Sequence, residues 1–457
     1  MIEADKKVIT HINWLAVDFD IVEQSVKILQ NRIVKAKLAS RSRMVKKLQS
    51  LLVKSLNARI LAVKRVSENK GKNTAGVDGK LLDTNIKKSK YVADLKIKLP
   101  DYKSMPLKRI EIPKKNGKLR PLGIPTMFDR SIQALYKLAL EPIAEVVADK
   151  NSYGFRPKRS TQDAMKQVWL CTSKKNGGEW ILEADIKGCF DNISHQWMYD
   201  NIPLDNRLLK QWLKSGFIKD DTLFPTDAGT PQGGIISPIL ANMVLDGIED
   251  IVKNHKARFQ KMVNGVIIYR HTNRLNFIRY ADDFVITGRT PEDLRLVQKD
   301  IEKFLNIRGL ELSKEKTHIT NIRDGFDFLG FNFRKYPNDK VIVTPTKDGI
   351  KSFKSKIKDI FKKYNSSSLT MLITKLNPLL RGWANYYRFV NSKVIFSKLD
   401  SYIWRKSLNW MKRIHQRRET KKYYKQYSSH FQITNQMYYL MEDSLFTDSL
   451  HFHSKNL

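Results

Sequence analysis

Cysteine is nearly absent from this chain, with only Cys171 and Cys189 among 457 residues. Two cysteines cannot build a disulfide framework or a cysteine-based zinc site, a pattern typical of a reducing compartment. No apolar run approaches the ~20 residues of a membrane span, so we expect none. Residues 1–5 have neither a basic nor an apolar leader pattern, and we expect no secretory or transit signal. This favours synthesis where the protein is used, in a bacterial cytoplasm or an organelle with its own genome (plastid or mitochondrion).

Acidic residues are few beside the basic ones. The chain has 83 Lys and Arg against 46 Asp and Glu, a formal charge of +37. Such an excess indicates a polyanionic partner, either nucleic acid or an anionic membrane. An AT-rich genome would raise Lys, Asn and Ile, but it does not explain the arginines. We therefore favour nucleic acid, bound by a chain long enough for two to four domains.

The N-terminal part is predicted to be helical and basic. Residues 20–64 show two apolar stripes at helical spacing, which predict two helices. Lys27, Arg32 and Lys35 lie away from the first stripe and are RNA-binding candidates. The alternative is a solvated helix face. A glycine-rich loop at 70–79 is expected to end this unit.

Short strands follow from about residue 106. Residues 107–113 alternate apolar and charged side chains, and Asn116-Gly117 predicts a tight hairpin turn. This hairpin would carry Lys114, Lys118 and Arg120 near its tip. Lys and Arg bind phosphate oxygens well, so the tip is a candidate triphosphate site. Ordinary solvated lysines are the alternative.

Further elements follow in order. We expect helices at 129–147, from Ser160, at 239–248 and at 291–305, and a strand-turn-strand at 326–331. Residues 180–186 predict a buried strand that carries Asp185 near its end, and a carboxylate there is costly without a partner. Residues 229–238 hold three glycines and two prolines around Gln232, which lets the backbone lie flat against something planar or charged.

Two adjacent carboxylates, Asp282 and Asp283, interrupt the apolar stretch 277–286 where a turn would fall. Alone, the pair favours a solvated hairpin tip, because Asp is a common turn residue. Together with Asp185, the pair would gather three carboxylates at one sheet edge. Three such acids can hold two Mg²⁺ ions roughly 3.5–4 Å apart, one activating a hydroxyl and one stabilising leaving pyrophosphate.

Two further side chains fit nucleotide chemistry. Phe190, five residues after Asp185, would lie under a bound sugar and disfavour a 2′-hydroxyl; plain core packing is the alternative. Lys316 is a candidate proton donor to pyrophosphate.

The C-terminal part is again basic and helical. An apolar stripe at 376–387 follows Asn377 as a cap and Pro378 at a first helical position. Residues 401–427 hold nine Lys and Arg against one acid, interleaved with aromatics, which suits single-stranded or irregular nucleic acid. The aromatics could instead form a small core.

The ordered motifs resemble those of reverse transcriptases encoded by group II introns, the intron maturases. They are KRIEIPKKNGKLRPLGIP (108–125), YGFRP (153–157), EADIKGCFDNISH (183–195), GTPQGGIISPILANMVL (229–245), FIRYADDFVI (277–286), GLELSKEKT (309–317), FDFLGF (326–331) and GWANYYR (382–388). Each motif is weak alone, but their order and spacing make the resemblance specific, from the N-terminal helices to about residue 427.

The resemblance implies an α+β right-hand polymerase with fingers, an antiparallel palm sheet and a helical thumb. The implied regions are an N-terminal RNA-binding extension (1–100), fingers and palm (101–340), a thumb or domain X (341–415) and a basic C-terminal segment (416–457). The family's catalytic aspartates fall on Asp185, Asp282 and Asp283, and its nucleotide contacts fall on Lys114, Arg120 and Gln232. Within GWANYYR, the RNA-binding candidates are Trp383, Tyr386, Tyr387 and Arg388.

The function implied is an RNA-directed DNA polymerase that binds its intron RNA, assists splicing and copies RNA into cDNA with a primer, dNTPs and Mg²⁺. Many relatives end in a zinc nuclease with paired cysteines. No cysteine follows residue 430 here, so we expect no endonuclease. Cys189 stands where we expect an aromatic or another small residue before Phe190, and the family's fold should tolerate it. The alternatives are an RNA-binding splicing factor with a vestigial polymerase, or a free-standing relative.

Overall fold

The computed structural model describes residues 12–113, 117, 119–174, 177–220, 222–231, 233–255, 257–263, 266–272 and 275–414. Two of the predicted nucleotide contacts, Lys114 and Gln232, lie outside these residues, as does the segment 416–457. The chain divides into two compact units. The first comprises 1–159, 183–286 and 292–318, and the second comprises 160–182, 287–291 and 319–457.

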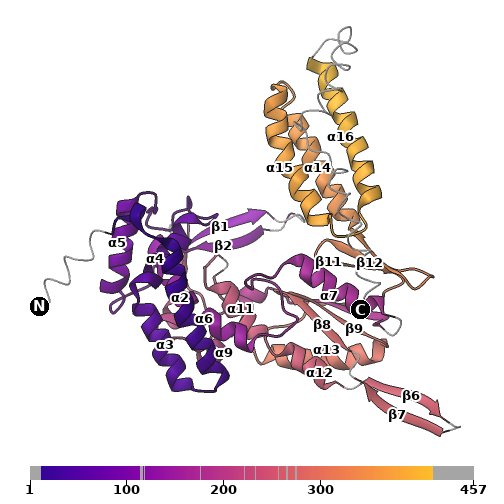
Figure 1. The fold of residues 1–457 in the computed structure, drawn as a ribbon, viewed down its shortest axis with the longest axis horizontal. Coiled ribbons are helices and arrows are strands. Elements are labelled where there is room, and N and C mark those ends of the chain that lie inside the picture. Colours follow the sequence, from indigo (N-terminus) through magenta and orange to yellow (C-terminus); the bar gives the residue numbers. More distant parts are fainter. Residues whose placement is uncertain are drawn as a thin grey trace, which may run out of the picture. The chain divides into compact units, whose positions relative to one another are not determined.

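Helices dominate the start of the first unit (Figure 1). They are η1 (Trp14–Ala16), α2 (Phe19–Leu38), α3 (Ser42–Lys54), α4 (Leu56–Glu68), α5 (Asn85–Ile97) and α6 (Met127–Val147). Helices α2, α3 and α4 all pack against α6, whose apolar face is buried. We expected two helices over 20–64, and this was wrong. Ser55 adopts an extended backbone (φ −65°, ψ 135°) that ends α3 and begins α4.

The predicted hairpin at 107–120 is confirmed by β1 (Leu107–Pro113) and β2 (Leu119–Ile124), which pair antiparallel. Strand β4 (Phe217–Lys219) joins β1 in parallel, and β5 (Thr222–Phe224) completes the sheet in the order β2-β1-β4-β5. Small helices precede β4, namely α8 (Cys189–Asn192), α9 (His195–Asn201) and α10 (Asn206–Leu213). The sheet thus forms from segments about one hundred residues apart.

A second four-stranded sheet has the order β10-β3-β9-β8. Its strands are β3 (Trp180–Asp185), β8 (Asn276–Tyr280), β9 (Asp283–Gly288) and β10 (His318–Asn321). Strand β9 does not alternate buried and exposed side chains. Phe284, Val285 and Ile286 are all buried, so both faces of the strand are covered. Nearby in the chain are α11 (Ser237–Leu245), α12 (Ile248–Asn254), α13 (Pro291–Asn306) and the hairpin β6 (Ala257–Val263) with β7 (Val266–Thr272).

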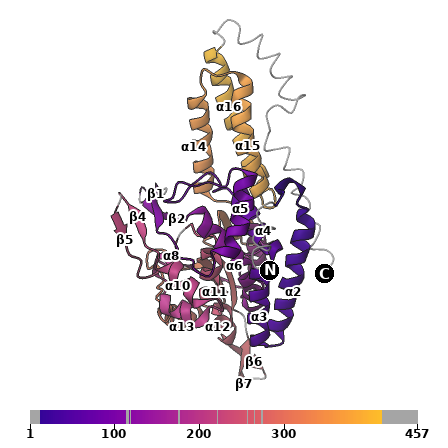
Figure 2. The same ribbon diagram turned by 90° about the vertical axis from the view of Figure 1, so that its left-hand side faces the viewer.

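The helix expected at 239–248 is confirmed by α11, which ends three residues earlier, at Leu245, while α12 begins at Ile248. The chain extends at Asp246 and takes a left-handed φ of 106° at Gly247, a conformation that glycine adopts readily. The helix expected at 291–305 is confirmed by α13. Figure 2 shows the first unit from a second direction, with α2 and α3 side by side.

The second unit combines helix α7 (Thr161–Ser173), a small sheet and three long helices. The sheet is β11 (Phe326–Phe328), β12 (Phe331–Lys335) and β13 (Val341–Pro345), and the helices are α14 (Lys347–Lys363), α15 (Leu369–Tyr387) and α16 (Lys393–Ile414). We expected Pro378 at a helix start, but it lies inside α15. An interior proline costs about 3 kcal/mol in an isolated helix, and α15 is held here with Leu376 and Leu380 fully buried.

Candidate active site

The two adjacent carboxylates lie on a tight turn, as predicted. Strand β8 ends at Tyr280, β9 begins at Asp283, and Ala281 and Asp282 connect them. Ala281 has a left-handed φ of 59°, which is uncommon for a residue with a Cβ atom. Such strain persists only where surrounding contacts hold it, and it is often found at functional sites.

Asp185 reaches this turn from the neighbouring strand. It ends β3, which lies beside β9 in the sheet. Its carbonyl oxygen accepts a hydrogen bond from Ser313 N (2.8 Å), which fixes the strand end to the segment before Lys316. Asp283 begins β9, the strand beside β3, and the proximity of Asp185 helps to raise its pKa. The structure therefore brings Asp185, Asp282 and Asp283 together.

These carboxylates repel one another. Desolvation raises the pKa of Asp283 to about 7, helped by the nearby side chain of Asp185 and the charges of Asp282 and Asp185. Desolvation also raises the pKa of Asp282. Buried Cys189 lies near the same charges, and burial raises the pKa of its thiol to about 12, so it stays neutral. The cluster thus favours any cation that compensates its charge.

Lys316 supplies one such charge. Its Nζ lies 2.7 Å from Asp185 Oδ2. The hydrogen bond to Asp185 raises the pKa of Lys316, and the charges of Asp283 and Asp282 act in the same direction. The predicted proton-donor candidate therefore belongs to the same cluster, and it is held in its protonated form.

Phe190 lies next to the described part of the glycine-rich loop. Its carbonyl accepts a 2.6 Å hydrogen bond from Thr230 N, and a Cβ on Gly229 would lie 2.5 Å from that same oxygen. The Phe190 ring is buried and meets Phe155 edge-on at 6.2 Å between centroids. Phe155 is half exposed and has a left-handed φ of 60°. The loop can approach this closely because residue 229 is glycine.

Arg120 is exposed on β2, and its charge offsets a small part of the rise that desolvation causes in the pKa of Asp282. The hairpin thus brings a guanidinium within electrostatic reach of Asp282. Among the described residues, no group of three or more His, Cys, Asp or Glu side chains is arranged so that it could hold a metal ion. Asp185 instead bonds to Lys316. The donor atoms themselves are hard carboxylate oxygens, which suit Mg²⁺.

The aromatic residues of 382–388 are packing residues. Trp383 stacks on Phe353 at 4.6 Å between ring centroids, and Tyr386 stacks on Phe331 at 5.1 Å. The Tyr386 hydroxyl donates to Leu329 O (2.7 Å), and the Tyr387 hydroxyl donates to Gly330 O (3.1 Å). These rings join α15 to α14 and β12, so their faces are used within the protein and we do not retain them as RNA contacts.

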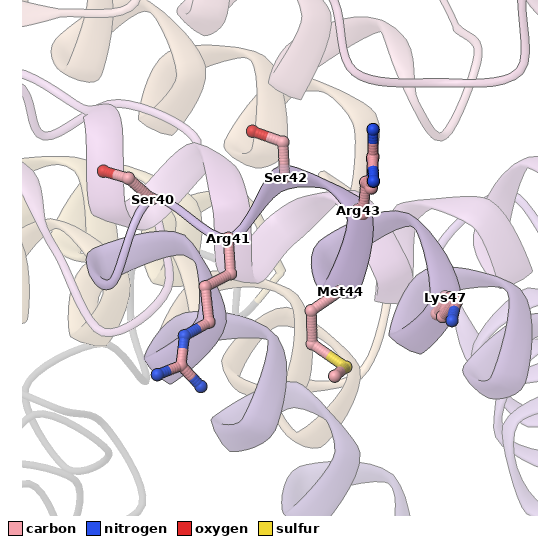
Figure 3. A pocket seen from close by; sticks show the side chains of 6 residues that line it. All are labelled: Ser40, Arg41, Ser42, Arg43, Met44 and Lys47. Carbon is pink, nitrogen blue, oxygen red and sulfur yellow. The ribbon is translucent and has the colours of Figure 1, made fainter.

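The RNA-binding candidates on α2, unlike these aromatic side chains, are exposed to solvent. Lys27, Arg32 and Lys35 are all exposed, while Val22 and Ile33 on the opposite side are buried. The turn between α2 and α3 adds a shallow basic pocket (Figure 3). Its lining residues are Ser40, Arg41, Ser42, Arg43, Met44 and Lys47. This end of the helical unit therefore presents cations to solvent.

The sequence patterns gave no role to three residues around the turn. Arg279 and Gly154 both contact Ala281 in the turn, and Asn242 hydrogen-bonds to both of them. One signal was available, because an arginine inside the apolar run of β8 requires a buried partner.

Comparison with known families agrees with this site. The reverse transcriptase (RNA-dependent DNA polymerase) family matches residues 112–333, which include all three carboxylates. The N-terminal domain of reverse transcriptase matches 14–95, and the group II intron maturase-specific domain matches 350–428. The α+β polymerase fold predicted from the sequence is confirmed by this match and by the mixed helices and sheets. The protein is an RNA-directed DNA polymerase.

Individual relatives narrow the family. The group II intron-encoded protein LtrA of Lactococcus lactis subsp. cremoris is 30% identical over 78% of this chain and 72% of its own length. Protein YkfC of Escherichia coli (strain K12) is 30% identical over 67% of this chain and 86% of its own. Maturase-like protein 1 of Euglena gracilis is 24% identical over 80% of this chain and 76% of its own length. This chain belongs to the group II intron-encoded reverse transcriptases and maturases.

Bacterial and eukaryotic relatives both occur, several of them named for the intron that encodes them. Among the described helices, none has the length and apolar character needed to cross a bilayer.

Proposed function

We propose that Asp185, Asp282 and Asp283 carry nucleotidyl transfer in this enzyme. The observation that supports the proposal is that β3, which ends at Asp185, lies beside β9 and the turn that carry Asp283 and Asp282, and that desolvation raises the pKa values of Asp282 and Asp283. Two Mg²⁺ ions held by these oxygens would activate the primer hydroxyl and stabilise the leaving pyrophosphate. The carboxylates would orient the reacting groups and would bind the cations in their deprotonated form.

The surrounding residues bind and select the nucleotide. Arg120 on β2 and Lys114, which lies outside the described residues, are proposed to contact its phosphates, and Gln232 its base. Phe190, whose backbone is held by Thr230, would lie under the sugar and exclude a 2′-hydroxyl. Lys316 is a protonated amine in this cluster and can give its proton to pyrophosphate.

The RNA partner follows from the family and the charge. We propose that residues 1–100 bind intron RNA through exposed cations of α2, including Lys27, Arg32 and Lys35. Residues 101–340 would form the fingers and palm, 341–415 the thumb or domain X, and 416–457 a basic tail without nuclease activity. Arg388 is retained as an RNA contact in domain X. The protein would assist splicing of its intron and copy it into cDNA, in a bacterial cytoplasm or an organelle with its own genome.

Primer extension tests the proposal. The full chain, an annealed RNA template and DNA primer, dNTPs and Mg²⁺ should yield cDNA, and Asp282→Asn should abolish it. Asp324→Asn, an exposed aspartate in the turn before β11, is the matched control and should keep the wild-type rate. Equal extension by the wild type and Asp282→Asn would contradict the proposed role of the cluster.

A splicing assay separates the two activities. Asp283→Asn should lose polymerisation but still assist intron folding, because RNA binding does not need the metal chemistry. If the wild type assists splicing but extends no primer with varied salt and template, the protein is a splicing factor with a vestigial polymerase.

A further inference from the structure

Arg279 is a completely buried charge beside the proposed catalytic turn. It lies on β8, three residues before Asp282, with 0% of its surface exposed. Burying an arginine costs several kcal/mol unless its donors are bonded. The hydrogen bonds of the Arg279 guanidinium therefore indicate which part of the structure the buried charge stabilises.

The guanidinium joins three groups. Its Nη2 donates to Asp246 Oδ1 (2.6 Å), and its Nη1 donates to Asn242 Oδ1 (3.1 Å) and to the carbonyl oxygen of Ala281 (3.2 Å). Ala281 is the strained residue of the turn, with φ 59°. Arg279 thus bonds the turn directly and ties it to α11 through Asn242 and to the chain after α11 through Asp246.

The loop 151–154 holds the turn from another side. The backbone of Arg279 donates to Asn151 O (2.9 Å) and accepts from Tyr153 N (2.8 Å). At Gly154, a Cβ would lie 2.3 Å from Ala281 N, so the two backbones are in direct contact. Asn242 Nδ2 donates to Gly154 O (2.8 Å). Because Asn242 bonds both Gly154 and Arg279, one side chain links the two supports.

We propose that Arg279, with Asn242 as its link to the loop at Gly154, is the positioning residue that holds the Ala281–Asp283 turn in its polymerising geometry. This rests on the proposed catalytic role of Asp282 and Asp283. The guanidinium fork fixes Ala281 in the left-handed region, and that conformation directs the following carboxylates toward Asp185. A lysine keeps the charge and the pair with Asp246 but cannot bond Asn242, Asp246 and the turn at the same time.

The test compares Arg279→Lys with Arg308→Lys in the full chain. Arg308 is a matched control because its guanidinium also bonds backbone carbonyls, Val244 O and Phe304 O (both 2.9 Å), and lies over the Phe304 ring. Each variant is measured for its unfolding midpoint, template affinity, kcat and KM for dNTP, and Mn²⁺ affinity in the absence of nucleotide. Mn²⁺ binding is the readout that a purely structural role would not move selectively.

Arg279→Lys should lose about 10–100-fold in kcat and in Mn²⁺ affinity, the range found when outer-shell support of metal ligands is removed. Its template affinity should stay within about twofold of the wild type, since the RNA contacts lie elsewhere. Arg308→Lys should lower the unfolding midpoint and leave kcat and Mn²⁺ affinity unchanged. If Arg279→Lys folds and matches the wild type in both, the inference is overturned.

Asn242→Ala tests the same inference without removing the charge, and it replaces Arg279→Lys if that variant does not fold. It should lower kcat and Mn²⁺ affinity in the same way, and wild-type values would overturn the inference. The double variant should be non-additive, because both residues act on one turn. Asp282→Asn is measured in parallel. If Asp282→Asn keeps wild-type activity, the proposed function is refuted. If Asp282→Asn is inactive but Arg279→Lys and Asn242→Ala both behave as the wild type, only the positioning role of Arg279 is refuted.

Discussion

Gly154→Ala should displace the turn that carries Asp282 and Asp283. A Cβ atom at Gly154 would lie 2.3 Å from Ala281 N and 2.9 Å from Tyr280 C, closer than the 3.0 Å that real Cβ contacts respect. Both neighbours are backbone atoms, so neither can rotate away. The loop or the turn must therefore move by an amount approaching 1 Å, and a misplacement of about 1 Å can cost on the order of 10²-fold in rate.

Single-turnover primer extension measures this effect, with template affinity and the unfolding midpoint recorded beside it. Gly382→Ala is the matched control. Gly382 lies inside α15, where a Cβ would meet nothing within 4 Å. Alanine is favoured over glycine in a helix interior by about 1 kcal/mol. Gly382→Ala should therefore keep the wild-type rate and raise the unfolding midpoint.

The two glycine variants thus have opposite expected outcomes. Gly154→Ala with wild-type rate and wild-type Mg²⁺ dependence would refute the close support of the turn. So would an equal loss of rate in Gly154→Ala and Gly382→Ala, because the second substitution lies in the second unit and meets no neighbouring atom.

Three further outcomes are expected. Phe190→Ala should reduce the preference for dNTP over NTP by about 10–200-fold, read from kcat/KM for each, and an unchanged ratio would make Phe190 a packing residue only. Lys316→Arg keeps a cation beside Asp185 but donates protons poorly, so the extension rate should fall by ~10²-fold or more with little change in dNTP KM; an unchanged rate would exclude proton donation. His195 is buried with Nε2 2.7 Å from Gly229 O and its Nδ1 without a partner, and burial lowers its pKa below 6.5. Since the unfolded chain takes up the proton first as pH falls below 6.5, the free energy of unfolding should decline there. Denaturant unfolding of His195→Gln should show a weaker decline, and an identical pH profile would contradict this.

Local sequence signals predicted much of the site. The Asn116-Gly117 turn and the alternation before it indicated the β1–β2 hairpin, and the apolar run ending at Asp185 indicated β3. Both signals are local, since they depend on turn chemistry and side-chain period. The joining of Asp185 to the Asp282 turn followed from the motif order, and the sheet order agrees with it.

The errors concern helix boundaries and the partners of one buried residue. Ser55 interrupts a continuous apolar stripe, whereas Pro378 lies within one, so the helix boundaries depart from the local residue preference at both sites. Helix α11 ends at Leu245, before the predicted end, and beyond it the Gly247 amide donates to Asp149 Oδ1, almost one hundred residues away (3.0 Å). The position of Arg279 in an apolar strand indicates a buried partner, but the sequence does not identify Asn242 and Asp246 as the partners, because they lie on a distant part of the chain.

The rate of dNTP addition by the wild type and by Asp282→Asn, with RNA affinity measured on the same preparations, tests the central claim most directly. The claim is that the carboxylates at the end of β3 and on the β8–β9 turn polymerise DNA on an RNA template. We predict cDNA synthesis by the wild type, none detectable in Asp282→Asn, and equal RNA affinity for both. Comparable synthesis by both proteins, with RNA binding intact, would contradict it.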